Sequence, residues 1–537
     1  MHLPKPLDPG RKCWNVAECA TVCHAFHEPT VRVVWRNMPG LPPLWQLLAP
    51  EDVDIPGPSE CPEWNYLEPV ISARLYEDSV RWNRFLWHAA HVRQLCIDAY
   101  TFVERERLLG LKELELDLVE LELREAGCVL LQAVAVKNGG RSILPGLRRI
   151  KCLGGTRAQA SVLVSLFTKT LHEASFLFTH QDDSDIATPQ LLRRFREVSP
   201  FLDSIAIDWY WKDTPDAESS LVQELVAFEC LRNVKVTHLS QFSLLRDLVT
   251  KPNIASVEVF RIIGPWAGLS QPIAAPSLCE LSIEGRMATL TCLFQSVQFQ
   301  ALKAAKIRAT SSPTRRLVAG DVVLFLATFG AASLELSFHC EYVPGALRGW
   351  SGPILPFREM RSFSLSSWNT LYWSVDDEDI GLLTQAWPKL ERLRMDGVTC
   401  SKPIPASALY HLYRYCPNLR EVSLPSLSCP IIGVHSIPAP SADIPPHGLQ
   451  RLSVKAFVSL PRSRLSNPKL EGFARYILDL FPRLDIHVCR LALDEWDRNR
   501  GRIDPKTLIR LLPPGAVVLE QGWESVMQFM CSVYEHQ

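Results

Sequence analysis

One short apolar pattern recurs along this chain of 537 residues and constrains its fold more than any other feature. In each copy an apolar residue is followed by a second one three residues further on and by a third after two more, as in Leu202, Ile205 and Ile207. From Leu147 onward, successive copies start between 23 and 31 residues apart, which indicates one structural unit repeated many times. The copies begin at Val92, Leu147, Leu171, Leu202, Leu231, Ile254, Leu278, Leu302, Ala331, Met360, Leu390, Leu419 and Leu449.

Each copy predicts one short β-strand, because alternate residues of a strand point to opposite faces. Repeated strands that lie side by side and parallel require a crossover between them, and the intervening segments have a helical pattern. We therefore predict an α/β fold: a right-handed solenoid in the form of a horseshoe, with a concave parallel sheet and helices on the convex side.

Two details of the crossovers support helices there. Leu409, Leu412, Tyr413 and Cys416 are spaced to form one apolar helix face, as are Phe473, Tyr476, Ile477 and Leu480. Prolines such as Pro200, Pro388 and Pro417 stand two residues before the first apolar position of a strand, where they end the preceding helix. Ser374 and Asp377 resemble a capping box, and the acidic run 376–379 is typical of a first helical turn.

The pattern also divides the chain. Residues 1–49 form a short helical segment, and 50–90, with four prolines between positions 50 and 62, form a linker and an N-terminal cap. Residues 91–490 are the irregular solenoid, in which 425–446 is an inserted proline-rich loop. Residues 491–537 are predicted to cap its C-terminal end.

Composition limits the possible partners and location. Lysine and arginine total 57 against 58 acidic residues, so no net charge draws the chain to nucleic acid or to an anionic membrane. The longest largely apolar stretch, Val322 to Leu334, has 13 residues and is too short to span a bilayer. The 16 cysteines form no C-x-x-C pair, and the first residues do not resemble a signal peptide. We expect a reducing location, the cytoplasm and/or the nucleus.

Catalytic motifs are absent from the sequence. We find no nucleophile elbow, phosphate-binding glycine loop, paired-histidine helix or dinucleotide fingerprint, so we predict that the chain is not an enzyme and has no cofactor. Cys19, Cys23, His24 and His27 are all zinc-ligand types, but their spacing on a helix and the lack of a second ligand pair favour buried structural cysteines over a metal site.

The predicted concave face offers a binding surface. The residue between the last two apolar positions of each strand faces solvent there, and these residues are small or charged. In order they are Ala206, Lys235, Glu258, Ser282, Lys306, Glu335, Ser364, Arg394, Ser423 and Ser453. We expect Lys235, Lys306 and Arg394 to orient a partner protein.

Aromatic residues that directly follow strands are candidate anchors for that partner. Tryptophan and tyrosine carry much of the energy in protein interfaces, which favours Trp209, Tyr210, Trp211 and Trp368 as partner-binding residues. The alternative is that these rings pack over the edge of the solenoid and bind nothing.

Several segments resemble those of F-box and leucine-rich-repeat proteins. They are Cys19 to Trp35, Trp82 to Leu86, Asp377 to Leu390 and Tyr415 to Leu419. Their order and spacing are most similar to a divergent F-box-like group of basidiomycete fungi. Two features depart from that pattern: the first half of the F-box is represented only by Leu3-Pro4, and the asparagine that closes a standard repeat is missing. Residues 1–49 are therefore a partial F-box-like segment.

The resemblance implies a protein-binding adaptor, the substrate-recognition subunit of an SCF-type (cullin-RING) ubiquitin ligase. Its Skp-type adaptor would bind the N-terminal apolar stripe, and an unidentified protein substrate would bind the concave sheet. The residues that the resemblance assigns to adaptor binding are Cys19, Val22, Cys23, Phe26, Pro29, Val34 and Trp35. Two alternatives remain: the stripe caps the open end of the solenoid, or the chain is a leucine-rich-repeat scaffold without a role in ubiquitin transfer.

Overall fold

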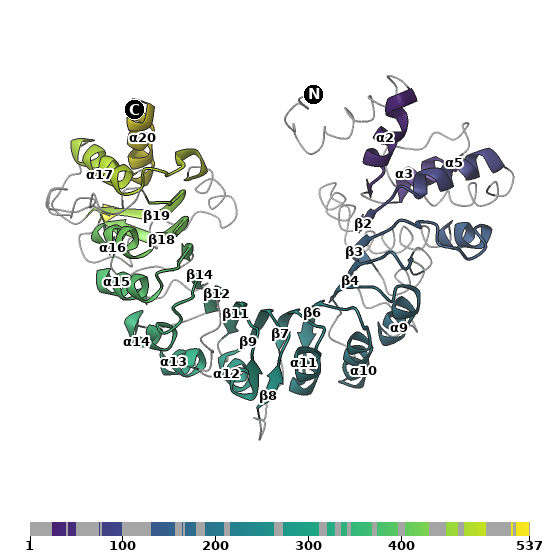
Figure 1. Ribbon diagram of the computed structural model, residues 1–537, viewed down its shortest axis with the longest axis horizontal. Coiled ribbons are helices and arrows are strands. Elements are labelled where there is room, and N and C mark those ends of the chain that lie inside the picture. The colour runs from purple at the N-terminus through teal and green to yellow at the C-terminus, as the bar shows by residue number, and fades with distance from the viewer. Residues whose placement is uncertain are drawn as a thin grey trace, which may run out of the picture. The chain divides into compact units, whose positions relative to one another are not determined.

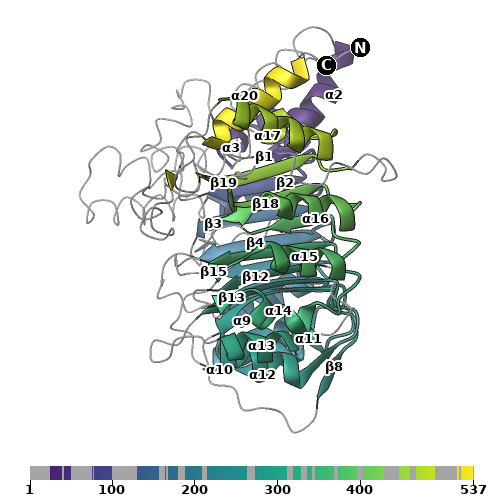
Figure 2. The same ribbon diagram turned by 90° about the vertical axis from the view of Figure 1, so that its left-hand side faces the viewer.

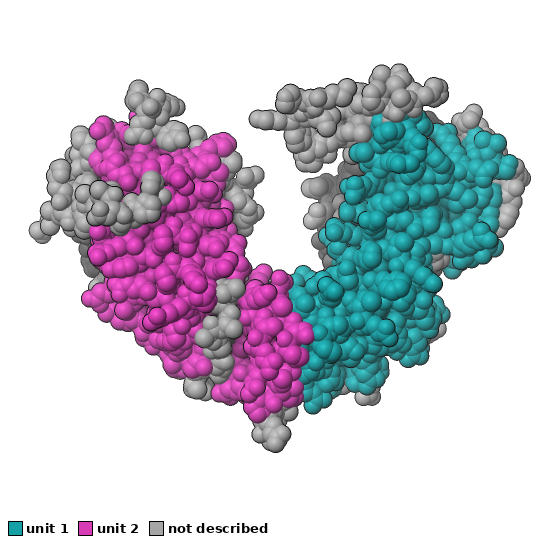
Figure 3. Space-filling model, viewed as in Figure 1, with its two compact units in different colours: residues 1–258 teal, residues 259–537 magenta. Residues whose placement is uncertain are grey.

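The structure is a computed structural model. It describes residues 24–38, 41–49, 75, 78–98, 130–155, 164, 167–178, 188–208, 215–262, 272–310, 319–327, 335–340, 345–367, 373–395, 403–428, 447–459, 467–489, 517–518 and 522–535. The chain divides into two compact units, Met1–Glu258 and Val259–Gln537 (Figure 3).

The first unit is built on parallel strands that pair in sequence order. They are β1 (Asn37–Met38), β2 (Gln94–Asp98), β3 (Arg149–Gly155), β4 (Glu173–Phe178), β5 (Ser204–Asp208) and β6 (Asn233–Leu239). The labelled helices are α2 (His24–Val34), α3 (Pro42–Gln46), α5 (Ser79–Ala89), α9 (Thr188–Val198), α10 (Pro215–Val226) and α11 (Phe242–Val249). Strand β7 (Ser256–Ile262) contains the boundary between the units.

The second unit continues the same arrangement. Its parallel strands are β9 (Glu280–Arg286), β11 (Ala304–Thr310), β12 (Glu335–Cys340), β14 (Ser362–Ser367), β16 (Arg392–Arg394), β18 (Glu421–Ser428) and β19 (Arg451–Ser459). The crossovers carry α12 (Met287–Ser296), α13 (Ala319–Ala327), α14 (Arg348–Ser351), η3 (Gly352–Ile354), α15 (Asp377–Ala386), α16 (Ser407–Tyr415) and α17 (Asn467–Leu480).

Short strands add to the second unit. β17 (Ile404–Pro405) pairs with β18, and β20 (Val517–Val518) pairs antiparallel with β19. Two small parallel pairs lie outside the main order: β8 (Ile273–Ala275) with β10 (Val297–Phe299), and β13 (Gly345–Ala346) with β15 (Trp373–Ser374). Helix α20 (Gly522–Glu535) packs against α17 and β19.

The core of each unit lies between its strands and the repeat helices, which cover one side of the strands (Figures 1 and 2). The inward apolar positions of neighbouring strands are in register, as Leu281, Ala305 and Leu336 are, and all three are buried. The predicted helix face of Leu409, Leu412, Tyr413 and Cys416 is buried too. The helices α9, α15 and α16 each end two residues before their prolines, as predicted.

Strand β12 differs from the prediction in register. Leu336 and Phe338 take the inward positions, so Ser337 and not Glu335 pairs with Lys306 in the middle of the sheet. Leu334, Leu336 and Phe338 alternate with polar residues in the sequence, so the apolar pattern fits two registers. The structure adopts the one that buries Phe338, whose ring stacks on Phe325 of α13 at 5.9 Å.

Helix α15 begins later than the predicted capping box. Its N-cap is Asp376, whose carboxylate accepts from the backbone N–H of Asp379 at 2.9 Å, while the Asp379 carboxylate accepts from the N–H of Asp376 at 3.0 Å. Aspartate fills both places of the box in which we expected Ser374 and Asp377. The acidic run does form the first helical turn, as predicted.

Strand β18 reaches Ser428 and so includes the first residues of the predicted loop 425–446; residues 429–446 lie outside the described part of the chain. The pairing of β18 with β19 passes over Pro425, which has no N–H to donate, and resumes at Ser426. Leu427 is fully buried, so the burial of one more apolar side chain accompanies the longer strand.

The fold is therefore an α/β solenoid of the leucine-rich-repeat type, and the predicted fold class is confirmed. Among the helices that the structure describes, none has the length and apolar character needed to cross a bilayer.

Candidate protein-binding face

The side of the strands opposite the repeat helices carries a row of small and charged side chains. We call it the strand face. In the first unit its middle row includes Ala206, Lys235 and Glu258; in the second unit it runs through Ser282, Lys306, Ser337, Ser364, Arg394, Ser423 and Ser453. Apart from β12, these are the positions that the sequence predicts.

Charged side chains of the strand face pair with each other across neighbouring strands. In the first unit Lys235 Nζ lies 2.9 Å from Glu258, and Arg149 lies 3.1 Å from Glu173. Because these groups are well exposed, each pair contributes little to stability, on the order of 0 to 1 kcal/mol. Lys235 is thus a paired charge, which sequence reasoning did not anticipate.

The second unit has a denser network. Arg308 pairs with Glu284 at 2.9 Å, and Arg392 with Glu335 at 2.8 Å. Glu421 accepts from both Arg394 at 2.8 Å and Arg451 at 3.2 Å, and its side chain is only 14% exposed. Lys306, by contrast, is exposed and makes no ion pair within the part of the chain that the structure describes. It is the predicted partner-binding residue whose charge is most available.

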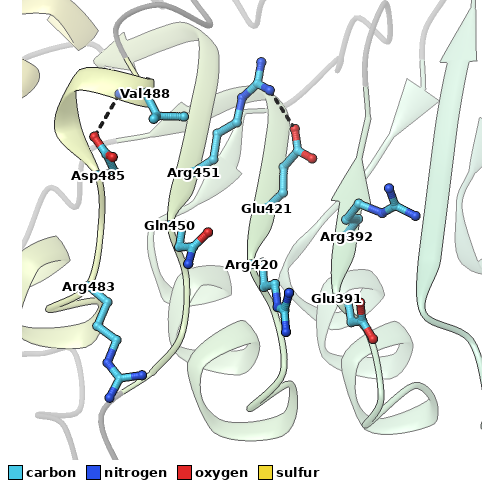
Figure 4. Close-up of a pocket in the computed structure, with 9 residues that line it drawn as sticks. All are labelled: Glu391, Arg392, Arg420, Glu421, Gln450, Arg451, Arg483, Asp485 and Val488. Atoms are coloured by element: carbon cyan, nitrogen blue, oxygen red, sulfur yellow. Dashed lines mark hydrogen bonds and ion pairs between the residues drawn. The ribbon is translucent and has the colours of Figure 1, made fainter. Parts of the chain in front are cut away.

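A pocket of about 610 Å³ lies at the start of the last strands of the second unit (Figure 4). Glu391, Arg420 and Gln450 stand one residue before β16, β18 and β19, and the turn around Arg483 and Asp485 follows α17. The other lining residues are Arg392, Glu421, Arg451 and Val488. The apolar spacing does not mark these positions, although the arginines in the turns of successive repeats are a signal that could have found them.

The structure tests none of the predicted aromatic anchors. Trp209, Tyr210, Trp211 and Trp368 lie outside the described residues. In the sequence Trp209 directly follows β5, and Trp368 directly follows β14. Their role in binding stays a prediction.

The predicted adaptor-binding stripe is described only in part. Cys19, Val22 and Cys23 lie outside the described residues, and Phe26 belongs to α2 with its side chain undescribed. Pro29 is exposed, Val34 is half-buried, and the half-buried Trp35 ring lies 4.5 Å from the ring of His88 on α5. Part of the Trp35 ring is therefore covered by His88 and is not accessible to an adaptor.

An exposed apolar surface nevertheless exists on α2 and α5. Val33 is 60% exposed and Trp87 is 38% exposed, and the Trp87 ring stacks on His27 at 5.9 Å. Sequence reasoning missed both, because which side of a helix stays uncovered depends on the packing of α2 on α5. We call Pro29, Val33 and Trp87 the N-terminal apolar surface.

Several buried groups, Cys416 and His88 among them, have strongly shifted pKa values without catalytic geometry. Burial raises the pKa of the Cys416 thiol to about 12, so the thiol stays protonated and is a poor nucleophile. Burial, and then the neighbouring Arg84, lowers the pKa of His88 to about 4, so His88 is neutral at pH 7. In the described part of the chain no three His, Cys, Asp or Glu side chains are grouped as metal ligands would be.

Comparisons with known proteins give weak likenesses. No protein-family model and no curated protein matches the sequence. Among solved structures, the leucine-rich-repeat-containing protein LegL7 from Legionella pneumophila is similar at 9% identity over 61% of this chain and 85% of its own, with a TM-score of 0.28. A complex of Rad7 and Elc1 in yeast is similar at 12% identity over 83% of this chain and 98% of the other, with a TM-score of 0.32. Both scores are low, so the fold assignment rests on the strand register and the helical crossovers.

Proposed function

We propose that this chain is a protein-binding adaptor and that a partner protein binds its strand face. The observation that carries the proposal is the polar strand face itself, which repeats along the strands of each unit, opposite the helices. Solenoids commonly use such extended surfaces for binding. We further propose that the chain acts without catalysis or a cofactor, in the cytoplasm and/or the nucleus.

The charged residues of the face have different roles in this proposal. Lys306, which is exposed and unpaired within the described residues, steers an acidic part of the partner. Lys235 and Arg394 are already paired with Glu258 and Glu421, so they orient the partner and add little net charge. Trp209, Tyr210, Trp211 and Trp368 would supply the apolar anchors at the carboxyl edge of the strands.

Charge reversal at Lys306 tests the strand face. A partner identified by proximity labelling is purified, and its affinity for the chain with Lys306→Glu is measured. We expect a loss of about three- to tenfold at low salt, while Lys251→Glu, which follows α11 on the helical side, has little effect. If a partner binds Lys306→Glu and a Trp209→Ala/Trp211→Ala variant with the affinity that it has for the unmodified chain, this face is excluded as the binding site.

We propose more specifically that the chain is the substrate-recognition subunit of a cullin-RING ubiquitin ligase, with a Skp-type adaptor bound at α2. Support comes from the resemblance of residues 19 to 35 to an F-box and from the exposure of Pro29 and Val33 on α2. A leucine-rich-repeat scaffold that binds proteins without a ubiquitin-ligase partner is the second candidate, and the packing of Trp35 on His88 within the chain favours it.

Co-purification of a Skp-type adaptor separates these two functions. Val33→Glu places a charge on the N-terminal apolar surface without touching the core, since Val33 is 60% exposed. We expect it to abolish adaptor binding, and Phe26→Ala to weaken it. Val136→Glu is the matched control, because Val136 is 70% exposed on the helix 130–137. An unmodified chain that retains no adaptor would favour the scaffold.

A further inference from the structure

The carboxylates around the pocket of the second unit are already engaged. Glu391 lies 3.7 Å from Arg361, and Glu421 is shared by Arg394 and Arg451. Asp485 accepts a hydrogen bond from the backbone N–H of Val488 at 3.0 Å. Glu391 and Glu421 are therefore ion-paired, whereas Asp485 makes no ion pair among the described residues and keeps its negative charge.

Two of the four arginines that line the pocket have no carboxylate partner among the described residues. Arg392 pairs with Glu335 and Arg451 with Glu421, but Arg420 and Arg483 make no ion pair among the described residues. Both are exposed. Figure 4 shows their side chains on either side of Gln450. The pocket thus presents two guanidinium groups that form no ion pair with any carboxylate among the described residues.

The spacing of the two arginines follows from the ladder. The turn that bears Arg483 extends the sheet beyond β19, because the N–H of Asp485 donates to the carbonyl of Gln450 at 2.9 Å, as the N–H of Gln450 donates to the carbonyl of Arg420. Asp485 is therefore two strand spacings, roughly 10 Å, from Arg420, and Arg483, two residues before Asp485, lies somewhat further from Arg420 at the backbone. Flexible arginine side chains can converge from there on acidic residues that alternate in an extended peptide, which are roughly 7 Å apart.

The mixed lining of the pocket selects among anionic ligands. A nucleic acid would bring an unbroken row of phosphates, and Glu391, Glu421 and Asp485 would repel some of them. A protein segment can instead carry anionic side chains only at the positions that face an arginine. The exposed amide of Gln450 lies between the arginines and can hydrogen-bond to a peptide backbone.

We propose that this pocket binds an extended segment of a partner protein that carries two acidic side chains two residues apart, one at Arg420 and one at Arg483. The inference rests on the proposed function and specifies part of the partner. Guanidinium groups bind carboxylates and phosphates through paired hydrogen bonds, so aspartate, glutamate or phosphoserine would each provide the required chemistry.

The test uses fluorescence anisotropy with the full chain and a labelled nine-residue Gly/Ser peptide that carries two glutamates two residues apart. At low salt we expect saturable binding, weakened about threefold by either Arg420→Gln or Arg483→Gln and about tenfold by both. Arg475→Gln on α17 is the matched control, since Arg475 is exposed on the helical side and should leave binding unchanged.

Further peptides define the ligand. A peptide with lysines at the two positions should not bind, and one with two phosphoserines should bind at least as well as the glutamate peptide; a clear gain would identify a phosphorylated segment as the natural occupant. No measurable binding of either anionic peptide, or binding that the double variant retains in full, would overturn the proposal.

The failure of this inference can be told apart from that of the proposed function. If purified partners bind the double variant Arg420→Gln/Arg483→Gln as before but lose affinity for Lys306→Glu, the strand face binds partners and the pocket does not. If the peptide binds through both arginines while every partner tolerates Lys306→Glu, the pocket binds acidic segments as proposed. The proposal that partners also bind the strand face at Lys306 is then wrong.

Discussion

Leu281 and Leu393 hold inward positions of β9 and β16, and their side chains are 1% and 0% exposed. Replacement of either by alanine should lower the free energy of unfolding by about 2 to 5 kcal/mol, because it removes buried methyl groups and leaves a cavity. Denaturant titration of the variants measures this loss. Leu382→Ala on α15, where the leucine is 45% exposed, should cost less than about 1 kcal/mol, and an equally small loss for Leu393→Ala would contradict the register.

His88 makes stability depend on pH. Its pKa falls from 6.5 to about 4 on folding, so the unfolded chain takes up the proton first as the pH drops. The contribution of His88 is complete above pH 6.5 and is lost between 6.5 and about 4, by roughly 3 kcal/mol in all. The unfolding free energy of the unmodified chain should therefore fall more steeply between pH 7 and 4.5 than that of His88→Gln. An exposed control, His172→Gln, should follow the unmodified chain; equal slopes for all three would refute the burial argument.

At the scale of the element, α15 depends on its capping box. Asp376→Ala removes the acceptor for the Asp379 N–H and a partner of Arg348, and should destabilise the chain by about 1 to 2 kcal/mol. Asp376→Ser keeps a hydroxyl oxygen that can cap the helix, so it should recover most of the loss in the same denaturant titration. Equal destabilisation by serine and alanine would show that the ion pair with Arg348, and not the cap, holds this helix end.

Elements were predictable where one residue type excludes alternatives. Pro388 ends its helix as predicted, although Pro29 lies inside α2, and apart from β12 the buried strand positions follow from the spacing. The register of β12 was not predictable, because Leu334, Leu336 and Phe338 alternate and only the packing of Phe338 on α13 decides between two fits. Strand pairing also overrode composition at Pro425, which lies inside β18 despite the prolines that follow it.

The candidate site was predictable only in outline. Spacing identified which residues lie on the strand face, including Lys306 and Arg394. It did not show that Glu421 holds two arginines at once, since such pairing depends on side-chain reach between strands that are far apart in sequence. Arg420 and Arg483 are recognised as unpaired among the described residues only after the other ion pairs are assigned.

At the scale of the whole molecule, both units present the same kind of surface: ordered strands, small or mutually paired polar side chains, and few apolar groups. Such a surface gives a partner room and electrostatic guidance while most of its own charges cancel. This combination suits specific recognition of a protein better than attraction of a bulk polyanion, in line with a formal net charge of -1.

A steric block on the strand face tests this account most directly. Ser364 lies half-buried in the middle row of the second unit, and Ser364→Trp would fill the space that a partner needs above β14. Arg475→Trp puts the same bulk on α17 at the helical side, where the arginine is 63% exposed. With a purified partner from proximity labelling, we predict at least about a tenfold loss of affinity for Ser364→Trp and no change for Arg475→Trp. Full affinity with Ser364→Trp, together with a loss for Arg475→Trp, would place the partner on the helices and contradict the account.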